Sequence, residues 1–143
     1  MQNLSNQPVK SALELKRKYA AGERNFRGAE LYKANLQESY LEGVDLSGAN
    51  LDAAKLSQAD LSGANLSGVF LRKANLREAN LSGADLFKDN LVGADLSEAD
   101  LRGADLRGAN LNGANLNGAK YDSYTVFPHN FDPVSAKMMQ VEE

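Results

Sequence analysis

Leucine recurs at every fifth residue through most of this 143-residue chain. The series of centres begins at Phe26, continues as eighteen leucines from Leu31 to Leu116, and ends at Tyr121. Alanine fills fifteen of the nineteen positions from residue 29 to residue 119 that lie two residues before a centre, and Asn or Asp fills fifteen of the twenty positions just before a centre. Glycine fills eleven of the twenty positions two residues after a centre. Any fold for this chain must therefore repeat with a period of five.

A period of five excludes a single helix and a single flat strand. A helix turns by about 100° per residue, so successive leucines would step round its axis by about 140° and form no apolar face. In a flat strand, an odd period sends alternate leucines to opposite faces. A corner inside each repeat lets leucine and the preceding alanine both point inward, with Asn or Asp outward between them. Glycine suits such a corner, but Lys, Glu and Gln also occur there, so we do not expect every corner to demand glycine.

Repeated corners wind the chain into a coil whose turns stack and pair their backbones. The phrase A-(D/N)-L-x-x, as in "ADLSGANLSG", resembles the pentapeptide repeat protein family over about residues 24–123. The ends, "YAAGERNFRGAEL" and "TVFPHNFDP", are similar to those of cyanobacterial members. This resemblance implies an all-β solenoid, a right-handed quadrilateral β-helix with four pentapeptides per coil and about five coils.

The open ends of a solenoid expose apolar side chains and unpaired strand edges, so we expect short α-helical caps. In residues 1–23, "SALELKRKYAAG" predicts a helix with Ser11 as N-cap, Glu14 in a capping box and Gly22 at its end. The side chains expected to cover the first coil are those of Leu4, Leu15 and Tyr19.

The C-terminal segment, residues 124–143, follows the β-helix of residues 24–123. Asp132 and Pro133 form an N-cap and first-turn pair, which predicts a helix through about Gln140. The apolar residues expected to form a lid ahead of it are Tyr124, Val126, Phe127 and Phe131.

Composition and motifs argue against an enzyme. The formal net charge is −3, which does not suit a direct nucleic-acid binder, and there is no cysteine for thiol chemistry. His129 is the single histidine, and nothing near it supplies a triad or a ligand set. The outward aspartates alternate with asparagine and lie near Arg102 and Arg107, so we predict no metal, no cofactor and no catalytic residue. Without a signal peptide or a membrane span, we expect a cytoplasmic protein that makes no membrane contact.

The function that we predict is a non-enzymatic scaffold for an unidentified protein partner. The resemblance implies an alternative, because some pentapeptide repeat proteins resemble duplex DNA in shape and charge and bind DNA gyrase. Residues 24–123 carry eleven positive and fourteen negative side chains, spread so that no face of a four-sided coil is strongly anionic. This spread favours the scaffold.

In the middle of the column, three large apolar residues break the polar outward pattern. Phe70 replaces the usual Asn or Asp, whereas Phe87 and Val92 occupy positions where Ser and Arg are common. In a four-sided coil Phe70 and Val92 share a face, and Phe87 lies at the corner leading into it. A contiguous apolar patch with charged neighbours suggests an interaction site, although the two rings could instead lie flat over neighbouring coils. The predicted protein-binding patch comprises Phe70, Arg72, Lys73, Phe87, Lys88, Asp89 and Val92.

Two further points stay open at this stage. Asp89 takes an inward alanine position, where it is either a buried carboxylate or part of a bulge that turns it outward. In the expected C-terminal helix, Val134, Met138 and Met139 are the candidate dimer contact. We favour a monomer in which these residues fold back over the last coil, with a dimer through the helix as the alternative.

Overall fold

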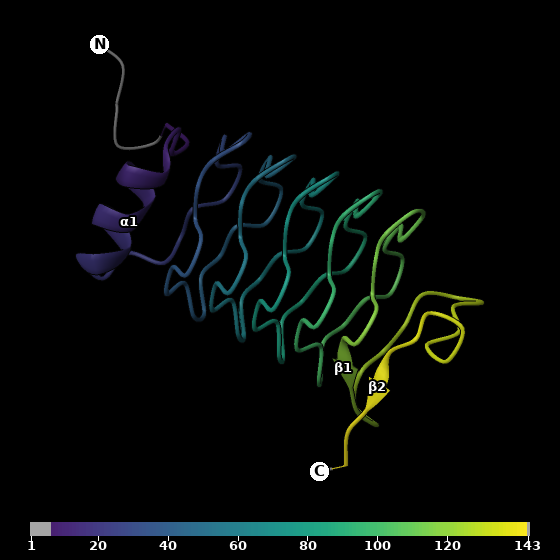
Figure 1. Ribbon diagram of the computed structural model, residues 1–143. Helices are drawn as coiled ribbons and strands as arrows, with labels where there is room; N and C mark the ends of the chain where they lie inside the picture. Colours follow the sequence, from purple (N-terminus) through teal and green to yellow (C-terminus); the bar gives the residue numbers. More distant parts are fainter. Residues whose placement is uncertain (1–6, 143) are drawn as a thin grey trace.

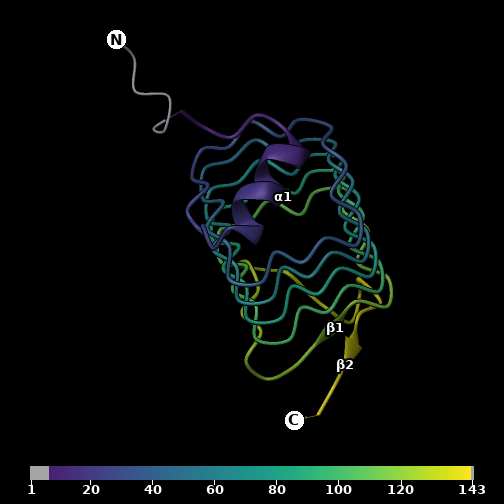
Figure 2. The same ribbon diagram turned by 90° about the vertical axis from the view of Figure 1, so that its left-hand side faces the viewer.

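The computed structural model describes residues 7–142 of the chain. Its named elements are one helix, α1 (Ala12–Ala20), and two short strands, β1 (Lys120–Tyr121) and β2 (Met139–Gln140). Between α1 and β1 the chain winds through stacked turns, with α1 at one end of the column and β1 and β2 at the other (Figure 1). Seen along the column, the turns superimpose, and α1 lies across the near end (Figure 2).

Backbone pairing joins residues that are twenty apart in the sequence. Parallel bridges run in this register from Asn25↔Asp45 to Asp100↔Lys120. The Leu31 N–H donates to the Asn50 carbonyl at 2.8 Å, and the Asn50 N–H donates to the Ala29 carbonyl at 2.9 Å. Twenty residues, or four pentapeptides, therefore complete one turn of the column.

The inside of the column is made of leucine and alanine, as the period predicts. Every leucine centre from Leu31 to Leu106 is at most 1% exposed, and the alanines two residues before them are buried with few exceptions. Alanine leaves room for the four walls to approach one another, and the leucines fill the space between them. The predicted inward positions of leucine and alanine are confirmed.

Each corner is a four-residue turn closed by a hydrogen bond, such as that from the Ala54 N–H to the Leu51 carbonyl at 3.0 Å. The third residue of the turn has a positive φ, between 58° and 74°, at all nineteen corners from residue 28 to residue 118. Eight of these residues are not glycine, among them Lys33 and Ala53. Because stacking aligns every corner with those above and below it, the backbone keeps one conformation whatever the side chain.

Helix α1 begins and ends where the sequence predicts. The Ser11 hydroxyl accepts from the Glu14 N–H at 3.1 Å, while the Glu14 carboxylate accepts from the Lys10 N–H rather than from Ser11. At the other end, Gly22 has φ 99°, and its N–H donates to the Tyr19 carbonyl at 2.9 Å. These bonds satisfy the free backbone groups of the helix termini.

Contacts between α1 and the column hold the helix across the first turn. Leu15 is fully buried, and the Tyr19 hydroxyl donates to the Glu42 carbonyl at 2.7 Å. Ahead of the helix, Val9 is buried and its carbonyl accepts from the Glu30 N–H at 2.8 Å. Leu4, which we also expect at this end, lies outside the described residues.

The predicted C-terminal helix is wrong. Asp132 starts a single helical turn, in which the Ala136 N–H donates to the Asp132 carbonyl at 3.2 Å, but Lys137 then takes a φ of 61°. The following residues form β2, which pairs in parallel with β1. The Met139 N–H donates to the Ala119 carbonyl at 2.8 Å. An extended chain satisfies backbone groups at the end of the column that a helix would leave unpaired.

Of the four apolar residues expected to form a lid, two pack against the core and two are exposed. The Phe127 ring lies 5.4 Å from that of Tyr121 and 5.2 Å from that of Phe131, and these phenylalanines pack against the core. Tyr124 and Val126 are exposed. The register also changes by one residue here, because Asp105 pairs with Val126.

Candidate interaction surface

Phe70 and Phe87 both present their rings to solvent, with 45% and 38% of their surfaces exposed. Phe70 lies in the outward column between Asn50 and Asn90, with which it forms bridges. The Phe87 carbonyl accepts from the Gly68 N–H at 2.9 Å, which places Phe87 one turn along and at the corner before Phe70. The aromatic pairs among residues 7–142 are those of the lid, so these two rings do not stack on one another.

A cation lies beside each exposed ring. The Arg72 guanidinium is 5.9 Å from the centre of the Phe70 ring. Lys88 Nζ and the Arg107 guanidinium are 5.2 Å and 5.8 Å from the centre of the Phe87 ring. Arg107 is missing from the predicted patch, although its spacing of twenty residues from Phe87 places it in the same column. A ring with a cation on its face combines apolar area with charge.

Carboxylates fix the two arginines in place. Asp52, one turn earlier, accepts from the Arg72 guanidinium at 2.6 Å and from the Arg72 backbone N–H at 2.7 Å. Asp105 accepts from the Arg107 guanidinium at 2.6 Å, and this hydrogen bond lowers the pKa of the Asp105 carboxyl. Asp52 and Asp105 therefore each form an ion pair with an arginine of this surface.

Lys73 and Val92 adjoin Phe70 and Arg72. The Lys73 N–H donates to the Val92 carbonyl at 3.0 Å, and Val92 is half-buried. The structure thus brings Phe70, Arg72, Lys73 and Val92 to one face, with Phe87 and Lys88 at the adjoining corner.

Asp89 points inward and does not belong to this surface. It is 1% exposed, and its Oδ1 accepts from the Val69 N–H of the previous turn at 2.8 Å. Its Oδ2 is buried without a partner among the described residues. Burial raises the pKa of the Asp89 carboxyl to about 8. The hydrogen bond from the Val69 N–H favours the charged form and lowers the pKa, but its effect is smaller than that of burial. Of the two alternatives for Asp89, the structure has the buried carboxylate.

The candidate dimer residues do not form one helical face. Val134 is 74% exposed in the turn after Asp132, and Met139 is 56% exposed in β2. Met138 packs against the core. The helix that would have aligned them is absent, since α1 is the one helix of the described chain.

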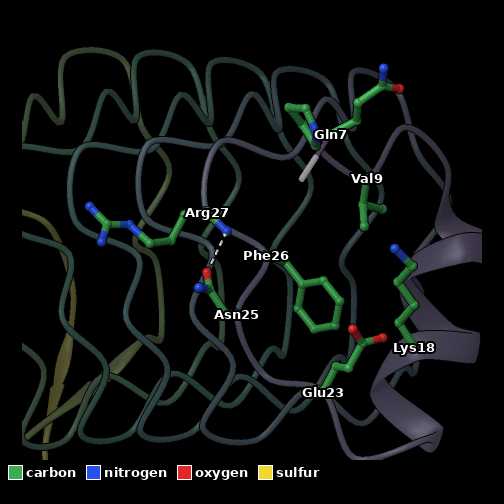
Figure 3. Close-up of a pocket in the computed structure, with 8 residues that line it drawn as sticks. Gln7, Val9, Lys18, Glu23, Asn25, Phe26 and Arg27 are labelled. Carbon is green, nitrogen blue, oxygen red and sulfur yellow. Dashed lines mark hydrogen bonds between the residues drawn. The ribbon is translucent and has the colours of Figure 1, made fainter. Parts of the chain in front are cut away.

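Two hollows lie at the two ends of the column. One, of about 260 Å³, lies beside α1, where the Phe26 ring faces Val9 and Lys18 (Figure 3). Another, of about 380 Å³, lies at the C-terminal end and includes His129. Within residues 7–142 there is no group of three or more His, Asp or Glu side chains placed to hold a metal ion. No helix in the same range is long and apolar enough to cross a membrane.

Comparisons with known proteins agree with the repeat. The family profile "Pentapeptide repeats" matches eight copies, over residues 25–63, 54–88 and 90–120. The pentapeptide repeat protein alr5209 from Nostoc PCC 7120 is 43% identical, with 95% of this chain and 100% of that chain covered and a TM-score of 0.40. Rfr23 from the cyanobacterium Cyanothece 51142 is 32% identical, with 81% and 99% covered and a TM-score of 0.55. A comparison with curated proteins gives no match.

Pentapeptide repeat proteins fold as right-handed quadrilateral β-helices, and they are generally non-enzymatic structural or interaction proteins. The pairing of residues twenty apart and the leucine interior are the features that this fold requires. With its sequence profile and its cyanobacterial relatives, the chain belongs to the pentapeptide repeat family.

Proposed function

We propose that this protein is a non-enzymatic scaffold that binds another protein through one side of its column. The scaffold that we infer has about five coils of four pentapeptides, with α1 and the C-terminal segment as its caps. Its binding site is the Phe70–Phe87 surface, which we define as Phe70, Arg72, Lys73, Phe87, Lys88, Val92 and Arg107. The observation that carries the proposal is the pair of exposed phenylalanine rings on neighbouring turns, each with a cation beside it.

Two physical features support binding at this surface. Aromatic and arginine side chains supply much of the binding energy in protein interfaces. The backbone N–H groups of these residues are all paired, and Asp52 already holds Arg72, so little order has to be created when a partner docks. The partner itself is unidentified.

Affinity capture with the intact protein, followed by mass spectrometry, would identify the partner. We expect the double substitution Phe70→Ser and Phe87→Ser to abolish its binding while the melting temperature stays nearly unchanged. The matched control is Tyr40→Ser with Tyr124→Ser, which removes two exposed rings elsewhere on the molecule, 80% and 70% exposed. Full affinity in the Phe70 and Phe87 double variant would disprove the site.

A salt titration of the same complex separates the scaffold from a DNA mimic that binds DNA gyrase. Affinity that falls steeply with salt would favour the mimic, because its contacts would be mainly charge pairs. We expect a shallow dependence, since the Phe70–Phe87 surface has apolar rings at its centre.

A further inference from the structure

The last turn of the column has an open backbone edge on part of its circumference. Six successive edge groups have no hydrogen-bond partner within residues 7–142. In the turn below, all six equivalent groups are paired; for example, the Leu91 N–H donates to the Asn110 carbonyl at 2.9 Å, and the Gly93 N–H donates to the Asn112 carbonyl at 3.0 Å. The open groups are the N–H of Gly108, Leu111, Gly113 and Leu116 and the carbonyls of Ala109 and Ala114.

On both sides of this gap, the C-terminal segment pairs with the edge as the next strand, or rung, of the column. The Leu106 N–H donates to the Val126 carbonyl at 2.7 Å, and the Gly118 N–H donates to the Lys137 carbonyl at 2.9 Å. Between these points, residues 127–136, which we call the connector, loop away from the edge. The connector makes local bonds instead, such as that from the Phe131 N–H to the Pro128 carbonyl at 3.2 Å. One strand of the next turn is therefore missing over residues 108–116.

This edge lacks the charges that normally protect an exposed strand. Native proteins discourage strand addition with charged side chains, proline or a covering loop. No charged residue occurs between Arg107 and Lys120, although charged residues are 24% of the chain. The outward positions here are Asn110 and Asn115, which carry no charge. Nothing in the sequence of this edge repels an incoming strand.

A hollow lies above part of the edge, and half-buried apolar side chains lie along the edge. A hollow of about 380 Å³ lies between residues 108–112 and connector residues 128–131. Leu111 and Ala114 are half-buried, although leucines and alanines in the middle of the column are fully buried. Ala109 and Leu111 are two residues apart and both face inward, so a strand lying on them would place its own alternate residues over them.

We propose that this edge binds an extended segment of a partner protein, which adds as a parallel rung. The segment pairs with the six open groups and places a small apolar residue over Ala109 and a leucine-like residue over Leu111. This mode of recognition takes its affinity from backbone hydrogen bonds and its specificity from alternate side chains. It is separate from the Phe70–Phe87 surface and does not depend on the proposed function.

A second copy of the whole protein fits this edge less well than a peptide. Its N-terminal end is already covered by α1 and by Val9, whose carbonyl pairs with Glu30. Its C-terminal end carries its own connector, which would meet the connector of the first copy. A narrow extended segment avoids both obstacles.

The test uses the intact protein and a fluorescein-labelled peptide with the sequence of residues 108–119, which carries the same alternation as the rung below. We expect saturable binding, and at least tenfold slower amide hydrogen exchange at Leu111 and Gly113 when the peptide is bound. The control peptide is N-methylated at its two asparagines that correspond to Asn110 and Asn115, which removes the donors to the Ala109 and Ala114 carbonyls. This control should not bind.

Two protein variants complete the test. Leu111→Pro removes an N–H that has no partner in the described chain and places the proline ring on the edge, so we expect no peptide binding. Leu111→Ala keeps the N–H and should bind with less than tenfold loss. Unchanged exchange at Leu111 and Gly113 with millimolar peptide, or equal binding of the N-methylated peptide, would overturn the proposal. A dimer that protects these amides without peptide would also overturn it. The Phe70→Ser and Phe87→Ser variant should still bind the peptide.

Discussion

Asp89 occupies a position that the repeat usually gives to alanine, and its burial makes the stability of the protein depend on pH. One carboxyl oxygen has the Val69 N–H as its partner, and the other has none among the described residues. With a pKa of about 8, the folded protein holds this proton at pH values where the unfolded chain, with a carboxyl pKa of about 3.9, has released it. Between about pH 4 and pH 8, this residue therefore lowers the free energy of unfolding as the pH rises.

We expect Asp89→Ala to be close to neutral at pH 5 and clearly stabilising at pH 8. The difference from the unsubstituted protein should grow by up to about 1.4 kcal/mol per pH unit between these values. Urea unfolding of both proteins at pH 5, 6.5 and 8 measures it, with Asp89→Asn as a control of similar shape that does not titrate. Parallel pH profiles for the two proteins, or a large loss of stability in Asp89→Ala, would contradict this account.

At the scale of the repeating element, the corners impose a left-handed backbone on residues that do not favour it. A non-glycine residue with positive φ carries steric strain that glycine avoids. Ala53 has φ 59°, and Gly63, two corners later, has φ 64° with no other atom within 4 Å of the point that a Cβ atom would occupy. The two corners differ mainly in the presence of a Cβ atom.

We expect Gly63→Ala to lower the free energy of unfolding by about 1 kcal/mol, and Ala53→Gly to raise it by a similar or smaller amount. The gain is reduced because glycine makes the unfolded chain more flexible. Urea unfolding at one pH compares the two variants with the unsubstituted protein. Effects of the same sign in both variants would show that backbone strain is not what distinguishes these corners.

The elements differ in how far the sequence could predict them. The leucine period predicts the inward and outward positions because one short pattern is repeated twenty times. The ends of α1 are also predictable, since Ser11 and Gly22 act on backbone groups within a few residues. The prediction of a C-terminal helix was wrong. Asp132 does start a helical turn, but the chain after it pairs with the last turn of the column, as in the hydrogen bond between Met139 and Ala119.

The same distinction applies to the candidate site. The period of twenty places Phe70 beside Asn90. It also places Phe87 one turn along, at the corner that precedes Phe70. The sequence could therefore predict that the two phenylalanines lie on the same side of the column. The cations beside the rings depend on side-chain conformations, which the pattern does not specify. The open edge at residues 108–116 could not be predicted, because it exists only where the connector leaves the column.

At the scale of the whole molecule, the C-terminal segment completes one part of the last turn. Three hydrogen bonds of 2.8–2.9 Å join the C-terminal segment to Gly118, Ala119 and Tyr121. A chain ending after Phe131 loses these three bonds and the cover of Met138. At about 1 kcal/mol for each bond, we expect a loss of roughly 3 kcal/mol in the free energy of unfolding.

We also expect both the full chain and this truncated chain to be monomers, since Val134 and Met139 do not form a continuous apolar face. Light scattering gives the masses, and urea unfolding gives the stabilities. A full-length dimer that becomes a monomer on truncation would show that the segment serves assembly instead.

The pairing of residues twenty apart determines how the chain responds to changes in its length. Inserting twenty residues into the column lengthens it by one turn and returns every later residue to its own side. Inserting five keeps the leucines inside but advances every later residue by a quarter turn. Five residues added between Phe70 and Phe87 would therefore leave the interior intact and move the two rings to different sides. The inward positions repeat every five residues, whereas the four sides of the column repeat every twenty. An insertion of five residues therefore moves outward side chains to another side and leaves the inward pattern unchanged.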